Sequence, residues 1–421
     1  MLYLCCDNQA TWYQARNAPL SLWTCLNGGR MKQEAAPKRR GVVHRCGKAS
    51  GEKKPDHLPE GLAHLQTSLL FLKRSMRTSG STLQQGIPSL FPETPGSFIT
   101  SCRRGREKRG RVSIERAVGR LEAGDVFRDW LAGVLWDRLP EPDDEARVYR
   151  IEPASHVVCR YEFIDAGISV IGKVFGAPTG AKTRYDANAA MMNEFHLLRS
   201  IARWVRVPGA LATNSRFHAV LVTEYVPGRT LRELLAAGES LYEPLTGVAH
   251  LLRRLHESTQ TSCDRERDFA YFHALLDQNG LPAPGRERFG RLLGAWRHSP
   301  RICPDAGCVV HGDATPGNYL FDGGTCAVDF EGSRDHAHPI RDLGILASEI
   351  KASPGSARAE DYIGHLLWHY SNGEEEFRRN TAQLPFFMAL GYLRIARLPW
   401  RAAERDWLLG EAEACLAAGP G

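Results

Sequence analysis

The sequence of 421 residues contains no run of about 18 consecutive apolar residues, so we expect no transmembrane helix and no membrane partner. Its first residues, Met1–Cys6, lack the basic start and apolar core of a secretory signal. The eleven cysteines are scattered, and the closest pair in the part that reads as folded, Cys303 and Cys308, has no second pair or histidines at zinc spacing. We therefore predict a cytoplasmic protein with reduced thiols and no zinc site.

The net charge of +6 averages two very different parts. Residues 1–111 hold 19 Lys and Arg against 7 Asp and Glu, whereas the rest hold 35 against 41, so the head is near +12 and the body near −6. The head has no sustained strand or helix periodicity, and we predict that residues 1–111 are a disordered basic segment. We do not expect nucleic acid to bind, except through this segment.

Helical patterning begins abruptly at about residue 113, which raises the hypothesis that the head is a gene-start artefact. Detection of the full-length chain in cells by mass spectrometry would contradict that hypothesis.

The remainder reads as an N-terminal helix and linker followed by two lobes. The stripe of Leu121, Phe127, Trp130, Leu131 and Leu135 predicts a helix over about 113–138, within an N-terminal unit of residues 112–142. Runs rich in Val, Ile, Tyr and Phe predict a β-rich lobe over 143–227 with one helix, at about 187–205. Helices dominate 228–421, apart from short strands at about 319–321 and 327–330. We therefore predict an α+β, bilobal fold.

The most informative stretch is His311-Gly312-Asp313 with Asn318 five residues beyond the aspartate, followed by Asp329-Phe330-Glu331. Phosphoryl transfer requires a carboxylate to accept the proton of the attacking hydroxyl, and hard oxygen ligands to hold Mg²⁺ on the phosphates. We predict Asp313 as the base and Asn318 with Asp329 as the magnesium ligands. His311 is expected to orient the loop, because a carboxylate already fills the role of base.

These motifs resemble the aminoglycoside phosphotransferase and choline kinase family, marked by His-Gly-Asp-x-x-x-x-Asn and an Asp-Phe-Glu triplet. The resemblance covers about residues 147–350 and implies a protein-kinase-like fold, ATP and Mg²⁺ as cofactors, and a nucleotide-binding N-lobe over 143–227. It also implies that the C-lobe, 228–421, is catalytic and binds the substrate, and that Asp342 braces the catalytic loop.

The same resemblance points to the nucleotide-binding residues. Lys173, in the strand Val170–Phe175, is the match for the phosphate-binding lysine, and Glu194 is its predicted partner on an otherwise apolar helix face. Glu224 and Val226 follow a strand that leads to the adenine-binding hinge, where they would contribute backbone groups. The first strand turn lacks the glycine-rich loop of protein kinases, so GTP stays open beside ATP.

The acceptor is expected to be a small hydroxyl compound, because the arginine and the activation segment typical of protein kinases are absent. A sugar, an amino alcohol and an aminoglycoside all remain open. Candidate polar lining comprises Glu331, Arg334, Asp335, His336 and His338. The alternative is a catalytically silent kinase-fold protein that binds nucleotide or a partner. The sequence gives no oligomeric state.

Overall fold

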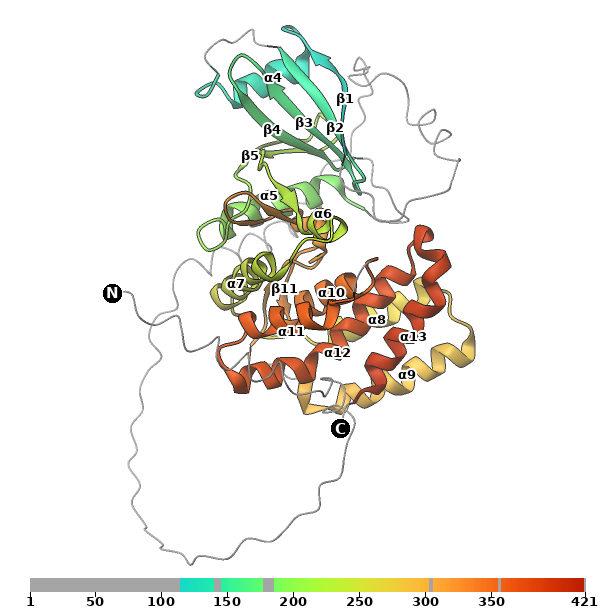
Figure 1. Cartoon of the computed structure of the whole chain (residues 1–421). Helices are drawn as coiled ribbons and strands as arrows, with labels where there is room; N and C mark the ends of the chain where they lie inside the picture. Colours follow the sequence, from blue (N-terminus) through green and yellow to red (C-terminus); the bar gives the residue numbers. More distant parts are fainter. Residues whose placement is uncertain (1–113, 140–144, 177–184, 303–305, 355–356, 420–421) are drawn as a thin grey trace, which may run out of the picture. The chain divides into compact units, whose positions relative to one another are not determined.

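A computed structural model describes residues 114–139, 145–176, 185–302, 306–354 and 357–419. The predicted disordered segment, residues 1–111, lies outside the described residues, as does most of the predicted linker. The described chain has one lobe built on a sheet and one built of helices (Figure 1), so the predicted α+β, bilobal architecture is confirmed.

The sheet lobe is built on six antiparallel strands in the order β1-β2-β3-β4-β6-β5. The strands are β1 (Ile114–Leu121), β2 (Ala146–Glu152), β3 (Val157–Phe163), β4 (Ile168–Val174), β5 (Ala210–Asn214) and β6 (Val220–Glu224). Two helices accompany them, α4 (Val126–Val134) and α5 (Ala187–Ile201). Phe127 of α4 packs on Tyr161 of β3, with ring centroids 5.2 Å apart. The lobe therefore has one helix more than predicted.

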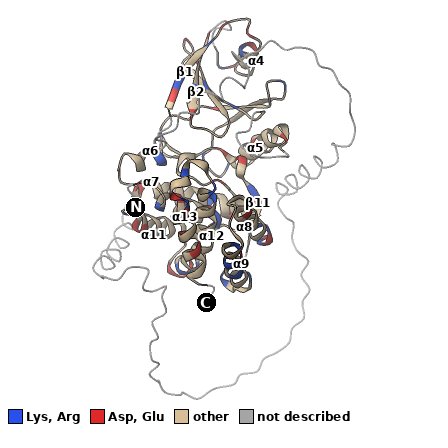
Figure 2. Ribbon diagram, turned by 90° about the vertical axis from the view of Figure 1, so that its right-hand side faces the viewer, with Lys and Arg blue, Asp and Glu red and all other residues tan. Residues whose placement is uncertain are grey.

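The predicted helix over 113–138 is wrong in its first half, because residues 114–121 form the edge strand β1. β1 pairs antiparallel with β2 and has no fully buried residue, so it shows no alternation of apolar and polar residues to reveal it. Figure 2 shows blue and red segments along this exposed strand. The helix starts only after Gly124, where Asp125 caps α4 by accepting hydrogen bonds from the N–H groups of Phe127 and Arg128.

The helical lobe holds eight α-helices in the described residues. These are α6 (Leu231–Ala236), α7 (Tyr242–Ser258), α8 (Glu266–Gln278), α9 (Ala283–His298), α10 (Ile340–Lys351), α11 (Ala359–Tyr370), α12 (Glu374–Ala396) and, at the end, α13 (Arg405–Ala417), with α6 lying next to the sheet lobe. Short 3₁₀ segments are η3 (Pro300–Ile302), η4 (Pro316–Asn318), η5 (Phe330–Gly332) and η6 (Pro399–Glu404).

Short strands in this lobe carry the predicted motifs. β7 (Arg229–Thr230), β9 (Tyr319–Phe321) and β10 (Thr325–Ala327) form one small sheet, and β8 (Cys308–Val310) pairs with β11 (Arg334–Ala337). The predicted strand over 327–330 is wrong beyond Ala327. Asp329 adopts the left-handed conformation (φ 64°, ψ 65°), which ends a strand, and η5 follows it.

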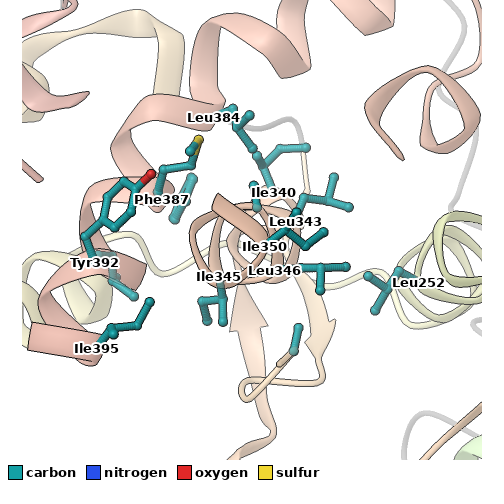
Figure 3. Close-up of a cluster of buried hydrophobic side chains, with 14 of the residues drawn as sticks. Leu252, Ile340, Leu343, Ile345, Leu346, Ile350, Leu384, Phe387, Tyr392 and Ile395 are labelled. Carbon is teal, nitrogen blue, oxygen red and sulfur yellow. The ribbon is translucent and has the colours of Figure 1, made fainter. Parts of the chain in front are cut away.

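The core of the helical lobe surrounds α10, whose residues 340–348 are all buried. In Figure 3 apolar side chains of α10 meet Leu384, Phe387, Tyr392 and Ile395 of α12 on one side and Leu252 of α7 on the other. Burial of each such side chain contributes about 1.5–3 kcal/mol. Helix α10 is thus a fixed support for the polar residues that it carries.

Within the described ranges, no helix combines the length and the apolar character that crossing a bilayer requires.

Candidate active site

Lys173 lies on the central strand β4, between β3 and β6, and its side chain is nearly buried. Its Nζ donates to Oε2 of Glu194 at 2.7 Å and to Oδ1 of Asp329 at 2.6 Å. Burial alone would lower the pKa of Lys173, but the two carboxylates raise it above its usual value. Lys173 is therefore a permanent cation that joins three predicted site residues.

Glu194 sits in the middle of α5, on the helix face that also buries Met191, Leu198 and Ile201. Its second oxygen, Oε1, accepts a hydrogen bond from the backbone N–H of Phe330 at 3.2 Å. The predicted Lys173–Glu194 pair is thus present, and Glu194 also holds the chain directly after Asp329. A buried carboxylate without these donors would carry a large desolvation cost.

The loop after β8 is held by Asp342 of α10, a fully buried carboxylate. It accepts hydrogen bonds from the N–H groups of His311 (2.6 Å) and Gly312 (2.9 Å), and His256 of α7 donates to it at 3.2 Å. Burial would raise the pKa of Asp342, but these donors bring it below the usual value. Asp342 therefore occupies the bracing position that the resemblance implied.

Gly312 makes a close turn in this loop, with φ at +79°. A Cβ there would lie 1.9 Å from the carbonyl oxygen of Gly332, which follows the Asp-Phe-Glu triplet. Since that neighbour is backbone, no side chain fits and the position requires glycine. The two catalytic segments predicted from sequence are therefore in direct backbone contact.

Asn318 lies next to both acidic residues of the predicted set. Its Nδ2 donates to the backbone oxygen of Asp313 (2.8 Å) and to Oδ2 of the same residue (3.3 Å). The backbone carbonyl of Asn318 accepts the N–H of Val328 at 3.0 Å, because β9 and β10 are paired there. Val328 directly precedes Asp329. Asp313 and Asn318 are thus in contact, Asn318 is joined to the residue before Asp329, and Asp329 is bound to Lys173.

The side chain of His311 contacts the residues on both sides of Asp329. Its Nε2 donates to the carbonyl oxygen of Val328 at 3.0 Å, and its ring stacks on Phe330 with centroids 4.4 Å apart. The side chain is thus engaged with the neighbouring segment, as an orienting residue would be.

Arg394 of α12 pairs with Asp313, a contact that sequence reasoning missed. Burial would raise the pKa of Asp313, but the Arg394 guanidinium, with His311 and Asn318, brings the pKa below its usual value. Asp313 is therefore ionised near neutral pH. No sequence signal links the two residues, because they lie 81 positions apart.

Glu331 lies toward the sheet lobe rather than beside Asp313. Its Oε2 is 2.5 Å from Nε2 of His156, in the turn between β2 and β3, and 3.7 Å from Nζ of Lys173. The Tyr185 hydroxyl lies 3.4 Å from its other oxygen. These contacts give Glu331 a supporting position beside Lys173, whereas the sequence predicted it in the acceptor lining.

The other candidates for the acceptor lining lie in different surroundings. His338 is fully buried and stacks on Phe387, so it cannot line a pocket. Asp335 and His336 contact the start of α8 and the loop before it, through Arg267 and Ser262. Arg334, two residues beyond Gly332, pairs with Asp268 of α8 at 3.3 Å.

The hinge residues lie at the end of β6. The N–H of Glu224 already donates to the carbonyl oxygen of Gly209 at 2.9 Å, and its side chain pairs with Arg138. The carbonyl of Glu224 accepts the Thr223 hydroxyl at 3.3 Å and keeps one lone pair for a nucleotide. Val226 forms no backbone hydrogen bond with any other described residue, so both of its backbone groups are available.

The oxygen donors fit Mg²⁺ bound together with phosphates better than Mg²⁺ bound by protein alone. In the described part of the chain, no group of three or more His, Cys, Asp or Glu side chains is arranged to hold a metal. Asn318 and Asp329, on segments joined by the Val328 hydrogen bond, would supply one amide and one carboxylate oxygen. Mg²⁺ in nucleotide sites needs little more protein, since phosphates and water complete its shell.

A buried lysine–glutamate pair and an ionised aspartate, joined through Asp329 and Asn318, form the arrangement that a phosphotransferase requires. The chain belongs to the phosphotransferase enzyme family, whose model matches residues 144–378. The prediction of a kinase-like phosphotransferase with an alcohol group as acceptor is thereby confirmed at the level of the family. No curated protein matches the chain.

Three solved structures are similar to the chain. A macrolide 2'-phosphotransferase from Brachybacterium faecium is 17% identical, with 63% of this chain and 91% of that chain covered and a TM-score of 0.41. An ethanolamine kinase from Plasmodium vivax is 12% identical (70% and 86%, TM-score 0.47). A choline/ethanolamine kinase family protein from Mesorhizobium loti is 20% identical (70% and 98%, TM-score 0.46).

Proposed function

We propose that this protein transfers the γ-phosphate of ATP to a hydroxyl group of a small molecule, in the cytoplasm. One observation carries the proposal: a continuous set of hydrogen bonds runs from Glu194 through Lys173 to Asp329, and from Val328 through Asn318 to Asp313. It joins the lysine of the sheet lobe to the base of the helical lobe, as phosphoryl transfer requires.

In the proposed reaction Asp313 accepts the proton of the acceptor hydroxyl as the oxygen attacks phosphorus. Arg394 keeps Asp313 ionised and fixes its orientation, and Asn318 holds its second oxygen. Lys173 binds phosphate oxygens, and Glu194 keeps its ammonium in place. Mg²⁺, held by Asn318 and Asp329, would neutralise charge on the β- and γ-phosphates. Asp342 and His311 position the loop and touch no reacting atom.

The adenine would bind the carbonyl of Glu224 and the backbone of Val226. The His156–Glu331 contact lies above Lys173, where protein kinases carry a glycine-rich loop. We expect the turn that carries His156 to lie over the phosphates in place of that loop.

The test is ADP release with ATP and Mg²⁺ over a panel of sugars, amino alcohols and aminoglycosides, with Asp313→Asn as the matched inactive control. We expect at least one acceptor to stimulate ADP release by the wild type and not by the variant. Nucleotide binding without stimulated release by any acceptor would instead support the silent alternative, in which the fold only binds nucleotide or a partner.

A further inference from the structure

Two arginines flank the loop between Asp313 and Asn318. Arg394 approaches from α12 and pairs with Asp313. Arg232, the second residue of α6, lies against Gly317: a Cβ on this glycine would be 3.3 Å from the Cζ of the guanidinium. The side of the loop where an acceptor must reach Asp313 is therefore bordered by cations from two helices.

Among the residues that the structure describes, Arg232 forms no hydrogen bond and no ion pair within 4.0 Å, and the carboxylate that acts on it from a longer range is Glu349. Arg232 is only partly exposed. A guanidinium removed from water without a partner is costly, so such a group indicates a place for an anion.

The nearby carboxylate of Glu349, on α10, does not compensate both arginines. Burial raises the pKa of Glu349, although Arg232 and Arg394 both oppose this change. A carboxylate with a raised pKa carries its negative charge less readily than an exposed one. The positive charge at this edge of the site is therefore only partly balanced.

Arg334 does not add to this charge, because Asp268 of α8 binds it at 3.3 Å and also binds Arg341 at 2.5 Å. A cationic acceptor would thus meet Arg232 and Arg394 beside the loop, balanced only in part by Glu349. An anionic acceptor would meet a free guanidinium next to the base.

We infer that the acceptor carries a carboxylate or phosphate group besides the hydroxyl that is phosphorylated, and that Arg232 binds this anionic group. The inference rests on the proposed function and narrows its substrate class. The guanidinium fork matches both kinds of oxyanion, and each such charge-assisted contact is stronger than a neutral hydrogen bond.

The first test measures binding and does not need turnover. The full chain is titrated calorimetrically with D-gluconate, D-glucitol and D-glucamine, which share one polyol skeleton and differ in charge. D-glucose 6-phosphate and D-glucose form a second pair, which separates phosphate from carboxylate. We expect at least one anion to bind about tenfold or more tightly than its neutral match. Neither anion binding more tightly than its neutral match would overturn the inference.

The variant Arg232→Gln should lose this preference, whereas Arg378→Gln, an exposed arginine of α12 paired with Glu374, should keep it. Arg232 could instead serve the nucleotide, and kinetics separate the two roles. A raised KM for MgATP with an unchanged acceptor preference in Arg232→Gln would overturn the inference.

Turnover separates failure of the inference from failure of the proposed function. If neutral or cationic acceptors are phosphorylated with a higher kcat/KM than the anions, the inference is wrong while the proposed function stands. If anions bind as expected but no compound of any charge receives phosphate, the proposed function is wrong, and with it the role of the anion as acceptor.

Discussion

The ammonium group of Lys173 on β4 lies 2.6 Å from the carboxylate of Asp329, which follows β10 in the other lobe. The same ammonium lies 2.7 Å from Glu194 of α5. One buried cation thus compensates a fully buried carboxylate and a half-buried one, and it ties the two lobes together at the point where the triphosphate is expected.

Replacement of this cation should destabilise the protein strongly. In Lys173→Met, Glu194 remains buried without a cation, and we expect the free energy of unfolding to fall by about 3–5 kcal/mol. Urea unfolding followed by circular dichroism measures the loss. The double variant Lys173→Met/Glu194→Leu should regain part of the stability but no activity. A single variant within about 1 kcal/mol of wild type would contradict the importance of the pair.

Asp329→Ala should abolish the magnesium dependence of nucleotide binding. We expect the wild type to bind ATP at least about tenfold more weakly when a chelator replaces Mg²⁺. The variant should bind weakly under both conditions, and Asp322→Ala, an exposed aspartate in the β9–β10 turn, should behave as wild type. Calorimetric titrations give these affinities, and a wild-type affinity insensitive to the chelator would count against the metal assignment.

Gly312→Ala should disrupt the catalytic loop, since the new Cβ would lie 1.9 Å from the backbone oxygen of Gly332. Gly323→Ala is a matched control, because its φ is also positive (+61°) but nothing lies within 4 Å of the added Cβ. The control should cost only about 1 kcal/mol in thermal or urea unfolding, with activity kept. Equal effects of the two changes would refute the steric explanation.

The protein should become less stable as the pH is lowered, because burial lowers the pKa of His338 to about 3. The unfolded chain protonates this histidine below about pH 6.5 while the folded chain does not, so the folded state loses about 1.4 kcal/mol per pH unit. Between pH 7 and pH 5 the wild type should lose roughly 2 kcal/mol more than His338→Asn. The asparagine oxygen can still accept the N–H of Ile340, which now bonds to Nδ1.

Unfolding at the two pH values tests this expectation, with the exposed His298→Asn as control. The same loss in wild type and His338→Asn would show that other groups set the pH dependence.

The catalytic cluster could be predicted from sequence because its members follow short strands at close spacing. Asp313 and Asn318 lie in one loop, which leads into β9. Asp329 follows β10, and because β10 pairs with β9, local pairing brings Asp329 near that loop. Lys173 and Glu194 could be predicted because charges on apolar strand and helix faces require partners.

Arg394 and β1 could not be predicted, for different physical reasons. The periodicity of α12 indicates which face is buried, but no local pattern reveals that Arg394 meets a loop 81 residues earlier. β1 is exposed on both faces at the edge of the sheet, so it lacks the alternation that marks half-buried strands.

Transfer of labelled γ-phosphate from ATP to an acceptor, compared between wild type and Asp313→Asn, tests the central claim most directly. The asparagine keeps the shape of the side chain but cannot take the proton, so we predict a fall in kcat of about 10²–10⁴-fold with the fold intact by circular dichroism. A folded variant that transfers phosphate at nearly the wild-type rate would contradict the assignment of Asp313 as the base.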